Sequence, residues 1–186
     1  MPRYLVSGIA GLVSDVAAVL REHDVEVVEV ADIDDVPRVC TDAGAAAFEG
    51  YIQLPATFTV QGDTAVTRVH HFFAEGVLAR FPAVAAALPA LKPDSRLTFV
   101  TGVLPQDVST EDDVAARAAL VRILGRAAQA DAANGLRICT LGSGATAKEI
   151  ALTALGRSSG AASTTSEPEE YSEWRIELLG MMWAET

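Results

Sequence analysis

The stretch Y-L-V-S-G-I-A-G-L-V-S-D-V-A-A-V-L, residues 4–20, decides the fold. A short apolar run ends in a glycine turn, and a helical pattern follows in which Leu12, Val16 and Leu20 share one face. The next run, V-E-V-V-E-V-A-D at 25–32, is rich in β-branched residues and favours a strand. Strand, helix and strand within about thirty residues make a βαβ unit with a right-handed crossover.

The same alternation continues along the chain. After a poorly periodic region that suits a short helix and loops, further strands are expected over 51–60 (interrupted or ended at Pro55), 95–105 and 136–142, and helices over 64–91 and 109–135. Pro82 should kink or break the first of these two helices. Strands that alternate with helices predict an α/β fold with a Rossmann-like, doubly wound, mainly parallel sheet covered by helices on both faces.

The sequence predicts one domain with a C-terminal appendage. Residues 1–156 form the Rossmann-like domain, the Gly- and Ser-rich segment 157–166 reads as a flexible linker, and 167–186 reads as an amphipathic helix of the same domain. Trp174, Leu178 and neighbouring apolar residues of that helix could dock on their own core, on a neighbouring subunit or on a protein partner.

Composition restricts the class of partner. The chain has 186 residues with a net charge of −11 and half of its residues apolar, so it can bury a core but lacks the clustered cations that nucleic acids and anionic membranes require. The sequence contains no uninterrupted apolar run of about 18 residues, so no membrane span is predicted. No signal peptide is recognised at the N-terminus. Cys40 and Cys139 lack metal-ligand spacing, so no metal site is predicted. A cytoplasmic protein fits these features.

Three stretches resemble the short-chain dehydrogenase/reductase superfamily. They are the opening βαβ unit, L-P-A-L-K-P-D-S-R-L-T-F-V-T-G (88–102) running into A-A-R-A-A-L-V-R-I-L-G-R-A-A-Q (115–129), and L-R-I-C-T-L-G-S-G-A-T-A (136–147). They span most of 3–147, although 33–65 matches poorly and the chain is shorter than a typical member by about one strand–helix pair and a final strand. The resemblance implies a Rossmann-type fold and a bound NAD(P).

The resemblance assigns a cofactor turn to S-G-I-A-G-L-V-S, residues 7–14, where the family has a pattern like T-G-x-x-x-G-x-G. Ser7, Gly8 and Gly11 would hold the dinucleotide, with Val13 in place of the last glycine. Asp32 would accept from the adenosine ribose and favour NAD over NADP. Alternatively, the two glycines only make a tight turn and Asp32 caps a loop.

Other candidate site residues follow later strands. Gly144 and Thr146 belong to a loop that should reach the same edge of the sheet, as ligand contacts or as plain connection. The adjacent His70 and His71 point about 100° apart on a helix and cannot easily ligate one metal.

The catalytic residues of the family have no match. The family's relay uses Ser, Tyr and Lys, with the last two four residues apart; here, with three tyrosines and two lysines, no pair has that spacing. Alignment places Thr101 near the Ser position, Asp113 at the Tyr position and Arg117 at the Lys position. Asp113 and Arg117 could equally form an ordinary helical ion pair.

Two functions remain open at this point. The first is a non-catalytic relative that binds a nucleotide or acts as a structural or partner protein, assembling as a homo-oligomer through the Ala-rich helix 111–131. The second is an atypical NAD(P)-dependent oxidoreductase for a small carbonyl or alcohol, with Asp113, His70 or water handling the proton.

Overall fold

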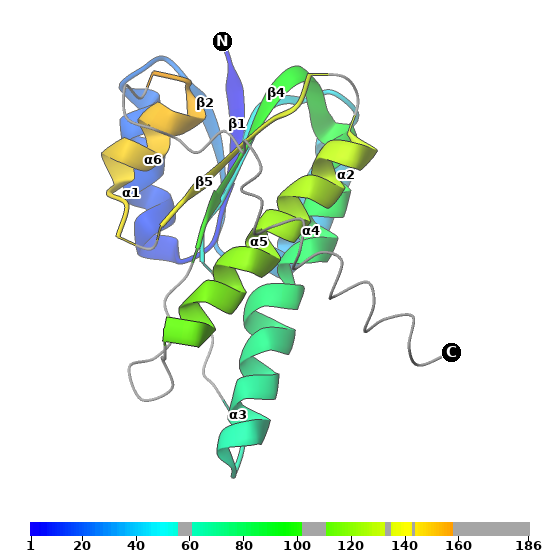
Figure 1. Ribbon diagram of the computed structural model, residues 1–186. Helices are drawn as coiled ribbons and strands as arrows, with labels where there is room; N and C mark the ends of the chain where they lie inside the picture. The colour runs from blue at the N-terminus through cyan, green and yellow to red at the C-terminus, as the bar shows by residue number, and fades with distance from the viewer. Residues whose placement is uncertain (56–60, 102–110, 133–134, 143, 158–186) are drawn as a thin grey trace.

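A parallel sheet forms the centre of the computed structural model, which describes residues 1–55, 61–101, 111–132, 135–142 and 144–157 (Figure 1). In the described residues the sheet has five strands in the order β2-β1-β3-β4-β5, and every neighbouring pair is parallel. The strands are β1 (Arg3–Ser7), β2 (Glu26–Val30), β3 (Phe48–Gln53), β4 (Leu91–Val100) and β5 (Arg137–Leu141). The predicted α/β fold with a Rossmann-like parallel sheet is confirmed.

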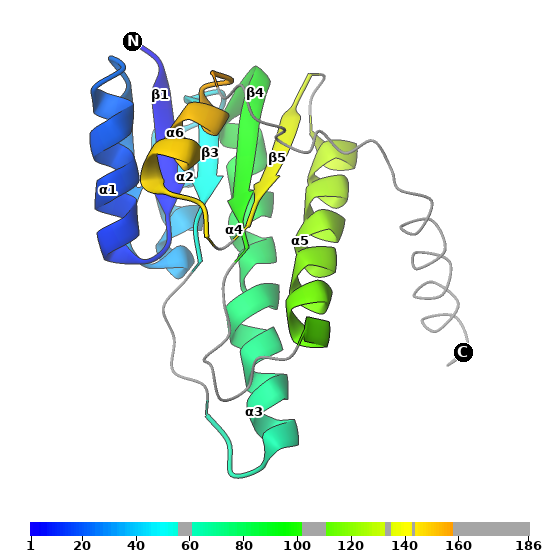
Figure 2. The same cartoon turned by 60° about the vertical axis from the view of Figure 1, so that its left-hand side comes forward.

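Helices cover both faces of this sheet (Figure 2). One face carries α1 (Ala10–Arg21) and α6 (Ala147–Ala154); the other carries α2 (Val36–Ala43), α4 (Arg80–Ala87) and α5 (Glu111–Asp131). Alternate residues of each strand point to opposite faces, so Val6 and Ile52 pack under α1 and α6. Leu5, Tyr51 and Phe99 pack under the other helices. Each fully buried aliphatic side chain contributes about 1.5–3 kcal/mol.

The long helical stretch after β3 is divided where the sequence predicts a break. It consists of α3 (Ala65–His71), a π-helical segment η2 (Phe72–Leu78), α4, and a 3-10 turn η3 (Leu88–Ala90). Pro82 lies in the first turn of α4, and its ring crowds the carbonyl four residues earlier, at Leu78, where the π-helical segment ends. The part that precedes α4 extends beyond the sheet (Figures 1 and 2).

By length and composition alone, the continuous helical stretch Ala65–Ala90 could cross a membrane, and it is the one such stretch in the described residues. Only about a quarter of its most apolar window (27%) is buried. Core helices of water-soluble proteins meet the same criteria, so the expectation that the protein does not associate with membranes stays a prediction.

Some boundaries differ from the expected ones. β3 begins at Phe48 and ends before Pro55, and residues 56–60 lie outside the description. β4 begins at Leu91 rather than 95, because Leu91 pairs with Phe48 of β3. Residues 92–95, which include Pro93, fall in the register shift before Gly50 pairs with Arg96, so the proline lies where the ladder is interrupted. A second short helical element, η1 (Ile33–Asp35), precedes α2. Most of the expected linker and all of the C-terminal helix lie outside the described residues.

Candidate functional site

The carboxyl ends of all five described strands meet at one edge of the sheet. Register pairs Ser7 with both Val30 and Gln53, and Val100 with Leu141. The turns that follow these residues therefore leave the sheet side by side. In open parallel sheets this edge is where ligands bind.

The turn after β1 is fixed by both neighbouring strands. The Gly8 N–H donates to the carbonyl of Val30 at 3.1 Å, and the Ile9 N–H donates to the carbonyl of Pro55 at 2.8 Å. Gly8 has a φ of +133°, and a Cβ there would lie 2.6 Å from the Cβ of Leu54. Only glycine fits, because both the backbone conformation and the space exclude a side chain.

This turn leaves the N-terminus of α1 open. Ile9, at the N-cap position, makes no side-chain cap, and the first N–H bonded back to it belongs to Val13. The N–H groups of the first turn thus remain available to an anion. Gly11 lies in this turn, is exposed, and a Cβ there would have no atom within 4 Å.

Val13, at the position of the family's last glycine, points away from the turn. Its side chain is buried in the core cluster that includes Val6, Ile52 and Leu54. Leu12 is half-buried and packs against the same cluster. The bulk of Val13 therefore lies between α1 and the sheet.

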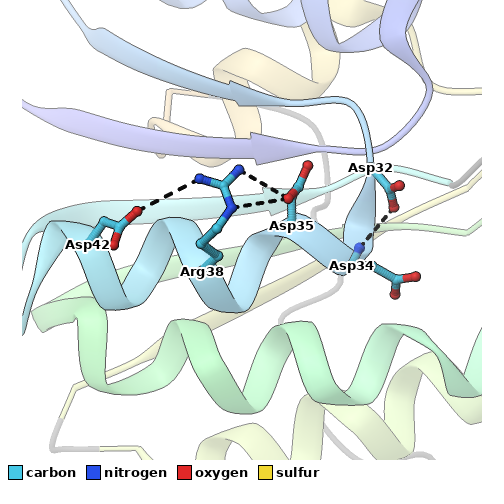
Figure 3. Close-up of polar contacts among 5 residues, drawn as sticks. All are labelled: Asp32, Asp34, Asp35, Arg38 and Asp42. Atoms are coloured by element: carbon cyan, nitrogen blue, oxygen red, sulfur yellow. Dashed lines mark hydrogen bonds and ion pairs between the residues drawn. The ribbon is translucent and has the colours of Figure 1, made fainter.

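Asp32 stands two residues after the end of β2 and caps η1 (Figure 3). The carbonyl of Val30, the last residue of β2, accepts from the N–H of Gly8. Oδ1 of Asp32 accepts from the N–H of Asp34 at 3.0 Å, which leaves Oδ2 outside this bond. The nearby Arg38 pairs with Asp35 at 3.0 Å and with Asp42 at 3.8 Å. The end of β2 is thus acidic, and its one neighbouring cation in Figure 3 is paired with carboxylates.

A buried polar chain runs beneath the same edge. The hydroxyls of Ser7 and Tyr51 lie 2.8 Å apart, and Nε2 of Gln53 donates to the Tyr51 hydroxyl at 3.2 Å. Nε of Arg80 donates to Oε1 of Gln53 at 2.9 Å. Burial raises the pKa of Tyr51 to about 12 and lowers the pKa of Arg80 to about 10. The Ser7 hydroxyl, predicted to contact the cofactor, is fully buried in this chain.

Sequence reasoning missed Tyr51, Gln53 and Arg80. Alternation along β3 could have signalled the first two, because Tyr51 and Gln53 are two residues apart and so fall on one face of the strand near its carboxyl end. Nothing in the sequence marks Arg80, which sits in a helix beside a proline.

The remaining predicted residues lie along β4, β5 and α5. The N–H and hydroxyl of Thr101 donate to the carbonyl of Leu141 at 3.0 and 3.3 Å. Thr146 caps α6 in a reciprocal box with Glu149, and Gly144 is exposed in the preceding loop. Asp113 and Arg117 lie in the first two turns of α5, and their side chains lie outside the description.

No tyrosine–lysine pair occurs in the part of the chain that the structure describes. Tyr4 is buried and donates to the carbonyl of Ala154. Lys92 pairs with Glu49 at 2.6 Å near the amino ends of β3 and β4, and Lys148 is exposed on α6. Tyr171 lies outside the description. The Tyr51 hydroxyl contacts Ser7 and Gln53 inside the buried polar chain.

The histidines lie in α3. Nδ1 of His71 accepts from the N–H of Gln61 at 3.3 Å, and His70 is exposed. Among the described residues, no three His, Cys, Asp or Glu side chains are grouped to hold a metal ion.

Solved structures supply the comparison, since neither a protein-family model nor a curated protein matches the sequence. Protein lin1944 from Listeria innocua is 17% identical with a TM-score of 0.61, over 87% of this chain and 96% of that one. A candidate short-chain alcohol dehydrogenase from Burkholderia multivorans is 14% identical with a TM-score of 0.59, over 83% and 89%. A small-chain dehydrogenase is 21% identical with a TM-score of 0.54, over 86% and 90%. The chain thus has the fold of short-chain dehydrogenase structures.

Proposed function

We propose that the protein binds a nicotinamide adenine dinucleotide at the carboxyl edge of its sheet and has lost the proton relay of the short-chain dehydrogenases. One observation carries this proposal. The Gly8 turn, bonded to the strands on both sides, presents the uncapped first turn of α1 next to Asp32 at the end of β2. This is the arrangement with which Rossmann folds hold a dinucleotide.

The residues present fit such a ligand. The free N–H groups at the start of α1 suit a pyrophosphate, and the open space around Gly11 allows close approach. Oδ2 of Asp32 can accept from a ribose hydroxyl while Oδ1 keeps its cap. Asp34 and Asp35 add negative charge beside Asp32, which disfavours the extra phosphate of NADP. NAD is therefore the expected dinucleotide.

The environment of Tyr51 supports the proposal of binding without turnover. A proton relay needs a tyrosine hydroxyl that faces the ligand and a lysine that lowers its pKa. Here the pKa of the buried Tyr51 is raised, and its hydroxyl is engaged by Ser7 and Gln53. Hydride transfer itself would be supplied by the bound dinucleotide, so turnover remains the alternative that an assay must exclude.

Calorimetric titration with NADH and NADPH tests the proposal. We expect NADH to bind more tightly than NADPH. Asp32→Asn keeps an oxygen that caps η1 but removes the negative charge. The difference in affinity between NADH and NADPH should therefore become smaller in this variant. Asp42→Asn is the matched control, because it removes the same charge near the other end of α2 and should leave both affinities unchanged. Absence of heat at millimolar dinucleotide would contradict the proposal.

A second assay separates binding from catalysis. NADH consumption is followed with a panel of small aldehydes and ketones at saturating dinucleotide. No turnover with demonstrated binding supports the non-catalytic function. Turnover that falls in Asp113→Asn would support the atypical oxidoreductase, with Asp113 in the role of proton donor.

Self-association is a separate proposal about α5. Its described half buries Val121, Leu124 and Ala128 against the sheet and leaves Ala127 and Ala130 exposed. Small exposed residues permit a second helix to pack closely. Light scattering on the wild type and on Ala127→Glu tests this, because a charge on that face should shift an oligomer toward monomer.

A further inference from the structure

We propose that the C-terminal segment, residues 158–186, docks on its own chain by inserting a tryptophan side chain into a cavity between α2 and the point where α4 passes into η3. The cavity lies at the amino end of the sheet, whereas the Gly8 turn lies at the carboxyl end. The inference therefore goes beyond the proposed function, and it does not depend on a dinucleotide.

The cavity has a volume of about 230 Å³ and is lined by small residues. Cys40 and Ala90 are the buried residues of its lining, at 4% and 2% exposure, and Ala86 is half-buried. Ala45 and Pro89 are exposed, so the cavity opens to solvent on their side. An apolar cavity of about 150 Å³ is enough to bind benzene, so this one has room for the larger indole ring.

The lining favours an apolar occupant, because the polar groups of Thr41 and Gly44 already have partners. Oγ1 of Thr41 donates to the carbonyl of Pro37 at 2.8 Å, and the N–H of Gly44 donates to the carbonyl of Cys40 at 3.1 Å. Burial raises the pKa of Cys40 to about 11, so its thiol is neutral at physiological pH and acts as a small apolar group. An aromatic side chain fits this lining better than a polar ligand, which would lose its hydrogen bonds to water there.

The loop between α2 and β3 fixes the shape of the cavity. The N–H of Ala46 donates to the carbonyl of Pro89 at 3.1 Å, which joins this loop to η3. Gly44 has a φ of +83°, and a Cβ there would meet no atom within 4 Å, so the space beside it is open. An incoming side chain therefore finds the cavity already formed.

The described part of the chain ends at the same edge of the sheet as the cavity. Nη1 of Arg157, just after α6, lies 3.1 Å from Nδ1 of His23, which precedes β2 and so lies at the amino end of the sheet. The cavity lies at this end too, because η3 leads directly into β4 at Leu91 and the loop that begins at Gly44 leads into β3.

The segment that follows Arg157 is long enough to reach the cavity. An extended chain spans about 3.3 Å per residue, so residues 158–173 could cover up to about 50 Å before Trp174. A small domain is only about 30 Å across. A tether of this kind raises the local concentration of the segment into roughly the millimolar range, which favours it over a separate molecule.

The segment also carries the side chains that suit the cavity. Both tryptophans of the chain, Trp174 and Trp183, belong to it. In the helix predicted over 167–186, Trp174, Leu178 and Met181 share one face. An aromatic side chain buries about 150–250 Å² when it docks, so a single tryptophan can anchor the segment.

Tryptophan fluorescence of the full chain tests the inference, because both tryptophans report on this segment alone. We expect an emission maximum at shorter wavelength than that of the urea-unfolded chain. Ala86→Phe fills the cavity and should move the maximum most of the way to the unfolded value. Ala85→Phe is the matched control, since it makes the same change at the neighbouring, exposed position of α4 and should leave the emission unchanged. An equal emission maximum in Ala86→Phe and the wild type would overturn the inference.

A second measurement leaves the cavity intact and guards against a variant that does not fold. A nitroxide is attached at Asp42→Cys, an exposed position of α2 beside the cavity, while the native Cys40 and Cys139 are buried. The two tryptophans give two indole N–H signals in the NMR spectrum of ¹⁵N-labelled protein. We expect this nitroxide to broaden at least one of them. A nitroxide at Asp15→Cys, exposed on α1 on the opposite face of the sheet, should broaden neither.

A mixed sample identifies the chain on which the segment docks. Nitroxide-labelled protein without ¹⁵N is mixed with ¹⁵N-labelled protein without the nitroxide. Broadening confined to the doubly labelled protein supports docking within one chain. Broadening in the mixture would overturn the inference, because the segment would then dock on a second copy. Sharp indole signals in every sample would also overturn it, because the segment would then lie away from the cavity.

Discussion

Replacing Gly8 or Gly11 with alanine should have opposite effects on stability, although both glycines belong to the same turn. A Cβ on Gly8 would lie 2.6 Å from the Cβ of Leu54 and 2.7 Å from the carbonyl oxygen of Pro55. A Cβ on Gly11 would meet nothing within 4 Å. Gly8→Ala thus forces the turn away from the end of β3, whereas the methyl group of Gly11→Ala meets no other atom.

The expected magnitudes follow from these contacts. At Gly8 the φ of +133° is a region that alanine rarely adopts, which costs about 1–3 kcal/mol, and the forced contacts cost about 1–3 kcal/mol more. Gly8→Ala should therefore lower the free energy of unfolding by about 2–6 kcal/mol. Gly11 lies in a helix, where alanine is preferred, so Gly11→Ala should raise it by about 0.5–1 kcal/mol.

Urea unfolding followed by far-UV circular dichroism measures both changes. Circular dichroism is chosen over tryptophan fluorescence because Trp174 and Trp183 both lie outside the described residues. A loss below about 1 kcal/mol in Gly8→Ala would refute the claim that the turn is locked against Leu54 and Pro55. A loss of similar size in both variants would show that the start of α1 is packed rather than open.

Three further predictions concern a buried tyrosine, a helix cap and the two cysteines. Burial raises the pKa of Tyr51 to about 12, above the usual value of about 10. The contribution of the neutral phenol to stability is therefore complete below about pH 10, and above that pH the free energy of unfolding should fall by up to about 1.4 kcal/mol per pH unit. Urea unfolding across this range should show a shallower fall of the free energy of unfolding in Tyr51→Phe. Thr146→Ala should cost about 1 kcal/mol by removing the cap of α6, while Thr146→Ser should restore most of it, as measured by thermal unfolding. Burial raises the pKa of Cys40 to about 11 and that of Cys139 in the same direction, so neither thiol should react with a disulfide reagent at neutral pH until urea unfolds the chain.

The opening βαβ unit was predictable because its local signals agree. The helical face of Leu12, Val16 and Leu20, the glycine at the turn and the β-branched run of β2 all indicate the same arrangement. The parallel sheet followed from the alternation of elements. The orientation of Val13 could not be predicted from the sequence. A valine at that position can pack either on the turn or on the sheet, and only the pitch of α1 decides between them.

Other features depend on contacts between distant residues. Arg80 could not be assigned from the sequence, since its partners Gln53 and Val100 lie 27 and 20 residues away. The start of β4 at Leu91 was missed because Pro93 argues against a strand. The proline is tolerated here because it lies in the register shift between the pairs Phe48–Leu91 and Gly50–Arg96. The helix α6 was missed although Thr146 and Glu149 carry the spacing of a capping box, a purely local signal that could have found it.

Gly11 is the glycine that distinguishes a functional turn from a purely structural one. Gly8 would be required in either case, because a side chain there collides with the end of β3 whether or not a ligand binds. At position 11 neither space nor backbone conformation requires a glycine. A glycine in a helix also lowers stability relative to alanine. The presence of Gly11 is explained if a ligand approaches the backbone there. Gly11→Ala should therefore be more stable than the wild type and bind NADH less tightly, whereas unchanged NADH binding would remove Gly11 from the site.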